Sequence, residues 1–251
     1  MIRAIAFWEA QILFRSRLGW ALLAVIQFLL AYLFFGQVDI YLTSIQPKSG
    51  TLENFPGVTA LLVSPLYGNA SVILMLLTPL VSMRAISLER SKRTLPLLIS
   101  APLALYEIVL GKYLGLLAFN LLAIAMISLM PLSLELATDL DYGKFAACIL
   151  ALFLVTSSFS AVGLCMSSLC KNPVSAASAT FGLLLLLWAI DWMPIGGDRS
   201  EGILKYLSIL NHFNNMRTGL IASGDVAYYV LLILTCLILS MRILREPSPA
   251  S

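Results

Sequence analysis

The chain has 251 residues, of which 60% are hydrophobic and 12% are charged. Soluble globular proteins average roughly 45–50% apolar and about 25% charged residues, so this chain has too few charges to cover a water-facing surface. A soluble fold is therefore excluded, a lipid bilayer is the expected surrounding, and the net charge of +3 gives no reason to expect a nucleic-acid partner.

The first seventeen residues have mixed polarity and the length of a short helix. Ile5, Trp8 and Ile12 recur at helical spacing, but Glu9 and three arginines interrupt the pattern. Tryptophan and arginine are favoured where lipid meets water, so residues 1–17 are predicted to form an interfacial helix. The alternative is a plain N-terminal extension of the first membrane span.

Six apolar runs follow along the chain. A helix needs about 20 apolar residues to cross roughly 30 Å of hydrocarbon. None of the runs contains Asp, Glu, Lys or Arg, and the last two are the shortest. The sequence therefore predicts an all-α integral membrane protein with six transmembrane helices, in one domain spanning residues 1–251. The runs extend from Leu18 to Val38, Val63 to Met83, Tyr113 to Leu134, Phe145 to Leu169, Val174 to Ile190 and Val226 to Met241.

The charged residues divide unevenly between the two sides of these runs. Eleven of the sixteen lysines and arginines fall on the side that carries both termini, and five fall on the other. Nine of the thirteen acidic residues fall on that second side. Cytoplasmic loops of membrane proteins carry an excess of lysine and arginine, so both termini are predicted to be cytoplasmic.

The densest cluster of charge lies in the predicted cytoplasmic loop between the second and third runs, residues 84–104. Glu89 precedes Lys92 and Arg93 by three and four residues, a spacing at which opposite charges meet on one helical turn. Pro96 limits how far such a helix can continue. Four apolar residues lie among these charges, and a loop in contact only with water would gain nothing from them. The loop is therefore predicted to form a short cytoplasmic helix that docks another protein, and the alternative is a solvated basic loop. The apolar residues are Leu95, Leu97, Leu98 and Ile99.

Small residues at helical spacing mark places where helices can approach closely. Such pairs are typical of contacts between membrane helices, within one chain or between two. Gln27, Asn69 and Asn120 are the strongly polar residues inside the runs, and they are predicted to hydrogen-bond across helices. The small-residue pairs are Gly111 and Gly115, Gly163 and Ser167, and Ser178 and Gly182.

The segment at 193–225, on the predicted outer side, is too long for a simple connection. Apolar residues recur at helical spacing on either side of a polar cluster around His212, and glycines at 202, 219 and 224 interrupt them. The pattern predicts two short, half-buried outer helices. His212 and the neighbouring asparagines are predicted to cap helices and form turns, with a ligand site as the alternative.

The sequence lacks the residues that several chemistries require. Ion-coupled transporters need ionisable groups at membrane depth, and no run contains one. A single histidine and four scattered cysteines give no paired metal-ligand spacing and no catalytic triad, and no Gly-rich phosphate loop is present. The chain is therefore predicted to be non-catalytic and to bind no metal or cofactor directly, so that energy for any driven work comes from another protein.

The loop and the outer segment resemble a known family. In the loop, Glu89-Arg90 is followed by Thr-Leu, Leu-Leu and Ala-Pro pairs, and a glycine-lysine pair comes directly before the third run. This order is similar to the signature of ABC type 2 transporter permeases. The outer segment resembles the gliding-motility branch called GldF, with NosY as a relative. The residue pairs are Thr94-Leu95, Leu97-Leu98, Ala101-Pro102 and Gly111-Lys112, and the outer motifs are Asn211-His212-Phe213, Arg217-Thr218-Gly219 and Tyr228-Tyr229.

The resemblance implies a permease subunit of an exporter-type transporter in the bacterial inner membrane. It implies pairing with itself, as a homodimer, or with a paralogue, and with two cytoplasmic ATPase subunits that bind ATP and magnesium. The short helix in the loop would be the coupling helix that sits in a cleft of the ATPase. Residues 193–225 would supply short re-entrant helices at the exit, with His212, Phe213 and Arg217 among them. The coupling residues that the resemblance implies are Ser87, Glu89, Arg90, Arg93, Thr94, Leu95 and Leu98.

Two positions depart from the family's pattern, and two other functions stay open. Arg93 stands where glycine is usual, and Pro96 stands where an acid is usual. The chain could instead be a mechanotransmission subunit that moves a periplasmic, membrane-anchored or lipoprotein partner, or a stand-alone scaffold or channel. The transported substrate is not predicted.

Overall fold

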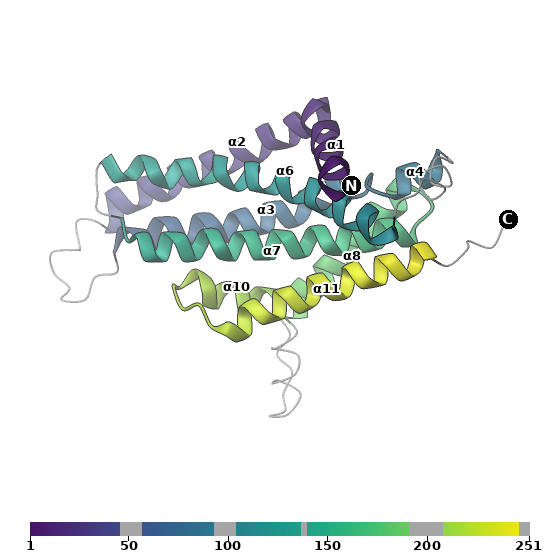
Figure 1. Ribbon diagram of the computed structural model, residues 1–251. Coiled ribbons are helices and arrows are strands. Elements are labelled where there is room, and N and C mark those ends of the chain that lie inside the picture. Colours follow the sequence, from purple (N-terminus) through teal and green to yellow (C-terminus); the bar gives the residue numbers. More distant parts are fainter. Residues whose placement is uncertain (46–56, 93–103, 137–139, 191–207, 246–251) are drawn as a thin grey trace.

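The computed structural model describes residues 1–45, 57–92, 104–136, 140–190 and 208–245. Within these ranges every regular element is a helix, which confirms the all-α prediction. The long helices run side by side, and the first helix lies crosswise near one end of them (Figure 1). The elements are α1 (Ile2–Arg15), α2 (Arg17–Ile40), η1 (Tyr41–Ile45), η3 (Thr59–Val63), α3 (Ser64–Ser82), α4 (Ser87–Ser91), α6 (Leu105–Ser133), η4 (Leu134–Leu136), α7 (Tyr142–Leu169), α8 (Pro173–Ala189), α10 (Ile209–Arg217) and α11 (Ser223–Arg245).

Five helical segments in the described ranges are long and apolar enough to cross a membrane. The fifth predicted run forms α8, whose 17 residues span about 25 Å and fall short of the roughly 30 Å of hydrocarbon in a bilayer. Residues that follow Ile190 lie outside the described part of the chain. The five long segments are Arg17–Thr43, Thr59–Ser91, Leu105–Ser133, Tyr142–Leu169 and Ser223–Arg245.

The N-terminal helix α1 is separate from α2. The backbone of Ser16 between them is extended, with φ −76° and ψ 128°, so the two helices do not form one continuous rod. The predicted stripe of Ile5, Trp8 and Ile12 is split: Ile5 is half-buried, whereas Trp8 and Ile12 are 65% and 49% exposed. The short helix at the N-terminus is therefore present as predicted, while its position at the membrane interface remains a prediction.

The third long helix begins earlier than the sequence predicted. The predicted run starts at Tyr113 because Lys112 is charged, whereas α6 begins at Leu105. Lys112 is only 3% exposed inside this helix, because two glutamates pair with its ammonium group. A charged residue with partners can therefore lie inside a helix that its charge appeared to end.

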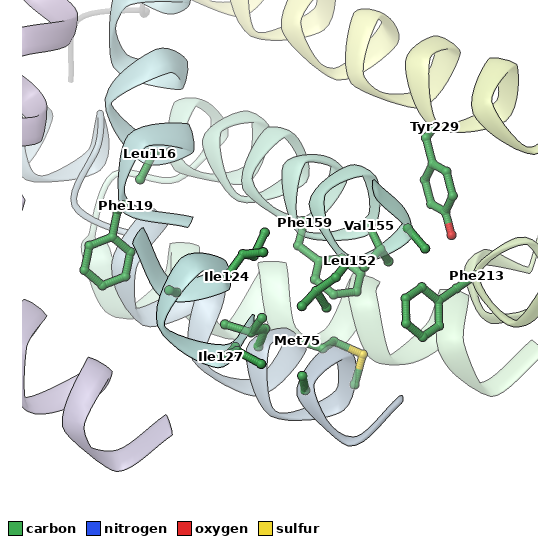
Figure 2. Packing of buried hydrophobic residues seen from close by; sticks show 14 of the residues in the cluster. Met75, Leu116, Phe119, Ile124, Ile127, Leu152, Val155, Phe159, Phe213 and Tyr229 are labelled. Atoms are coloured by element: carbon green, nitrogen blue, oxygen red, sulfur yellow. The ribbon is translucent and has the colours of Figure 1, made fainter. Parts of the chain in front are cut away.

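The central helix of the bundle is α7, which contacts α3, α6, α8, α10 and α11. In its most apolar stretch 72% of the residues are buried, against 22–44% in the other four long segments. Two of its buried hydroxyls bond within their own helix: Thr156 Oγ1 donates to the Leu152 carbonyl at 2.8 Å, and Ser158 Oγ donates to the Leu154 carbonyl at 3.0 Å. Figure 2 shows the apolar cluster around this helix, with Leu152, Val155 and Phe159 among its members.

Two of the three predicted interhelical amides bond across helices. Asn120 Nδ2 on α6 donates to Ser160 Oγ on α7 at 2.8 Å and to the Thr156 carbonyl at 3.2 Å. Gln27 Nε2 on α2 donates to the Met126 carbonyl on α6 at 3.2 Å. Side-chain bonds of this kind contribute about 0.6 kcal/mol on average between membrane helices. The third amide, of Asn69, has no hydrogen bond within the described ranges.

Candidate coupling site at the α4 end of the bundle

One hydroxyl near the C-terminal end of α7 holds the start of the short helix α4. The N–H groups of Ile86 and Ser87 donate to Ser167 Oγ at 3.0 and 2.9 Å, and this hydroxyl donates in turn to the Met83 carbonyl at 3.2 Å. The first N–H groups of a helix have no acceptor within the helix itself. Ser167 therefore supplies the acceptor that the start of α4 requires and fixes its position on α7.

A lysine on α6 joins α4 to α1. Lys112 Nζ pairs with Glu89 Oε1 of α4 at 2.7 Å and with Glu9 Oε1 of α1. The lysine is 3% exposed, while the side chains of Glu9 and Glu89 are 17% and 27% exposed. We call these three residues the Lys112 ion-pair cluster. It connects three helices at the end of the molecule where both α1 and α4 lie (Figure 1).

Two glycines of α6 allow α1 to approach closely. A Cβ atom at Gly111 would lie 2.6 Å from Ile5 Cγ2, and one at Gly115 would lie 2.6 Å from Glu9 Cβ. Real Cβ atoms essentially never come within 3.0 Å of another heavy atom, so neither position has room for a larger residue unless α1 moves. Small residues of this kind let membrane helices pack backbone to backbone. Gly111 and Gly115 thus allow a close contact between two helices of the same chain.

His212 is held between α10 and α11. Its Nδ1 lies 2.6 Å from Asp225 Oδ1, and the two side chains are 5% and 8% exposed. The imidazole stacks on Tyr228 with ring centroids 4.3 Å apart, and the hydroxyl of Tyr229 donates to the Ile209 carbonyl at 2.9 Å. These contacts hold α10 against the first turns of α11. Among the described residues, no group of three or more histidine, cysteine or acidic side chains could hold a metal ion.

The boundaries of α10 follow from capping chemistry. Ser208 Oγ accepts a hydrogen bond from the N–H of Asn211 at 3.2 Å, as an N-cap serine does. Gly219 has φ +97°, a left-handed conformation that ends a helix and favours glycine. The predicted break at this glycine is therefore confirmed.

Arg217 joins the end of α10 to α3 and α7. Its Nη1 donates to the Ser64 carbonyl at 3.4 Å, and its own carbonyl accepts a bond from Cys148 Sγ at 3.5 Å. The guanidinium lies beside Gly68, where a Cβ atom would occupy the same space. Burial lowers the pKa of Arg217 from its ordinary value. Arg217 therefore helps to fix the end of α10 against α3 and α7.

We expect His212→Ala to lower the free energy of unfolding by about 2 kcal/mol, because it removes the partner of a buried Asp225 carboxyl group. Unfolding of the purified protein in mixed micelles, followed by circular dichroism, measures the change. The double variant His212→Phe with Asp225→Leu should lose less, since both polar groups are removed together. A double variant less stable than His212→Ala would contradict the importance of this pair.

The structure places only some of the predicted coupling and packing residues. Ser87, Glu89 and Arg90 lie on α4, where Arg90 Nη1 donates to the Leu169 carbonyl at 3.5 Å. A Cβ atom at Gly163 of α7 would lie 2.5 Å from Ser82 Cβ of α3. On α8, Ser178 is exposed and a Cβ atom at Gly182 would meet nothing within 4 Å. The predicted coupling residues outside the described part of the chain are Arg93, Thr94, Leu95 and Leu98.

Four residues of these contacts were not singled out as site residues from the sequence: Glu9, Lys112, Ser167 and Asp225. Lys112 and Glu9 are 103 residues apart, so no local spacing could relate them. Ser167 was recognised only as a small residue that permits close packing. Its proximity to a proposed docking helix becomes visible only when α7 is placed.

The family model described as ABC-2 family transporter protein matches residues 3–244 of the chain. The match includes α1, α4 and the helices that the Lys112 ion-pair cluster joins. No curated protein matches the chain.

Proposed function

Because the chain belongs to the ABC-2 family of transporter proteins, we propose that it is the transmembrane permease subunit of an exporter-type ATP-binding-cassette transporter. The chain is a multi-pass membrane protein and supplies no catalytic residue of its own. Two cytoplasmic ATPase subunits bind ATP and magnesium and hydrolyse the ATP. The permease converts their movement into passage of a substrate across the bacterial inner membrane.

The attachment of α4 supports this mechanism. The helix is held at its start by Ser167 of α7 and through Glu89 by Lys112 of α6. A force applied to α4 by a partner would therefore reach α7 through the Ser167 hydrogen bonds and α6 through the Glu89–Lys112 ion pair. Arg90, Arg93, Thr94, Leu95 and Leu98 make the contacts to the ATPase in this proposal, while Glu89 acts chiefly within the chain.

The proposed topology has six spans, with both termini in the cytoplasm. The crossing that is added to the five long segments is α8, the fifth in chain order. The uneven division of basic residues supports the orientation. In Figure 1 the start of α1, the helix α4 and the end of α11 lie toward one end of the bundle, as a cytoplasmic location of all three requires.

A second permease copy, or a paralogue, completes the transporter in this proposal. Ser178 and Gly182 face outward on α8, and small outward-facing residues permit close contact with another membrane helix. The outer residues His212, Phe213 and Arg217 are buried or half-buried within the chain, so they shape the outer helices rather than contact the substrate. Membership of the gliding-motility or NosY-like branch, and a periplasmic or lipoprotein partner, are further parts of the proposal.

The test is the ATPase activity of the complex with the ATP-binding subunit encoded together with this chain. We expect Leu95→Asp with Leu98→Asp to reduce permease-stimulated ATP hydrolysis at least about tenfold, since charges in a desolvated contact cost several kcal/mol. Membrane insertion should be unchanged.

The matched control is Leu220→Asp with Ile221→Asp, the same chemical change at exposed residues outside the loop. This control should keep wild-type stimulation. Equal stimulation by both double variants would refute the docking of the loop, and a complete lack of ATPase partner or stimulation would favour a scaffold or channel.

A further inference from the structure

A cavity of about 590 Å³ lies between α1, the end of α3, α4 and α6. This volume is within the range of about 300–1,000 Å³ typical of small-molecule sites. Its apolar walls come mainly from α1 on one side and from α3 and α6 on the other. The residues that matter for the argument are Trp8, Ile12, Leu13, Val81 and Leu116.

The charged lining of the cavity is not balanced. Lys112 is committed to Glu9 and Glu89, which together leave one negative charge in excess. Arg84 and Lys92 also line the cavity, are exposed, and form no ion pair with any described residue. The charged lining as a whole therefore carries a net charge of +1.

The cavity is also bordered by a surface suited to lipid. On α1, Phe7 and Trp8 are 70% and 65% exposed, and Ile12 is 49% exposed. Aromatic side chains of this kind are enriched at the boundary between lipid and water. A ligand that enters beside α1 would therefore meet an apolar wall together with Arg84 and Lys92, two cations that pair with no described residue.

We propose that this cavity binds one anionic phospholipid, with the headgroup phosphate at Arg84 and Lys92 and an acyl chain against Ile12 and Leu13. A phosphatidylglycerol headgroup carries one negative charge, which matches the +1 of the lining. A basic pocket at the end of membrane helices is a typical site for an anionic headgroup. In the proposed orientation the lipid comes from the cytoplasmic leaflet. The inference does not depend on an ATPase partner.

The test is a titration of the purified full-length chain in mild detergent with phosphatidylglycerol, phosphatidylcholine or inorganic phosphate. The rise in the midpoint of thermal unfolding reports binding to the folded state. We expect phosphatidylglycerol to stabilise the protein at lower concentration than phosphatidylcholine. Arg84→Gln with Lys92→Gln should weaken phosphatidylglycerol binding about 25-fold, from about fivefold for each cation.

The matched control is Lys171→Gln with Arg242→Gln, which removes two exposed basic residues outside the cavity lining. Equal weakening by both double variants would overturn the site, because it would show attraction to the whole basic side. Stabilisation by inorganic phosphate equal to that by the lipid would overturn the lipid as occupant. Ile12→Gln tests the acyl contact: it should weaken phosphatidylglycerol binding, and unchanged binding would remove the acyl chain from the proposal.

Discussion

Replacing Lys112 by methionine should lower the free energy of unfolding by about 3 kcal/mol. Removal of one partner of a buried ion pair typically costs about 3–5 kcal/mol, because the other charge stays behind without compensation. The lower value is expected here, since Glu9 and Glu89 are 17% and 27% exposed and water reaches them in part. Two like charges would also be left near one another. Chemical unfolding in mixed micelles measures the loss.

The chain offers a matched control in its other lysine ion pair among the described residues. Lys144 lies 3.7 Å from Asp141, and the two side chains are 44% and 51% exposed. Surface pairs contribute about 0–1 kcal/mol, so Lys144→Met should change the stability little. Adding Glu9→Gln and Glu89→Gln to Lys112→Met should recover much of the loss. If Lys112→Met and Lys144→Met cost the same, the buried cluster does not hold these helices together.

Gly115→Leu should displace α1 from α6. A Cβ atom at this position would lie 2.6 Å from Glu9 Cβ, 3.2 Å from the Ala10 nitrogen and 3.4 Å from the Ala6 carbonyl oxygen. Two of these are backbone atoms, which can give way only if the whole helix moves. Overpacking of this kind costs about 1–3 kcal/mol, and the displacement should also break the Glu9–Lys112 pair.

Hydrogen exchange at residues 2–15 measures the displacement directly. In Gly115→Leu the amides of α1 should exchange faster, while those of α7 should keep their protection. Gly36→Leu is the control, because a Cβ atom at Gly36 of α2 would meet nothing within 4 Å. Wild-type protection of α1 in the Gly115 variant would show that α1 is not held by close packing on α6.

The apolar helices could be predicted because their signal is local. A run of some 20 residues without charge identifies a helix for the bilayer whatever it packs against, and each of the six predicted runs corresponds to a helix in the described part of the chain. The predicted start of α6 at Tyr113 was wrong because it depended on contacts that are not local in sequence. The neutralisation of Lys112 depends on Glu9 and Glu89, which the chain brings from two other helices.

The candidate site was only partly predictable for the same physical reason. Charge and leucine spacing marked the segment around Glu89 as a docking helix, and glycine spacing marked Gly111 and Gly115 as a packing face. The identity of each partner depends on tertiary structure. Glu89 pairs with a lysine 23 residues away, and His212 pairs with an aspartate 13 residues away.

The helix α1 is synthesised well before its partner residues on α6. Glu9 is made 103 residues before Lys112, and ribosomes add about 5–20 residues per second. The N-terminal helix therefore waits about 5–20 seconds for its ion-pair partner, and still longer until that segment has left the ribosome and entered the membrane. During this interval Glu9 has no Lys112 to pair with, and α1 has no α6 to pack against. Nascent chains that stop before Gly115 should accordingly carry an N-terminal helix open to insertion factors and proteases.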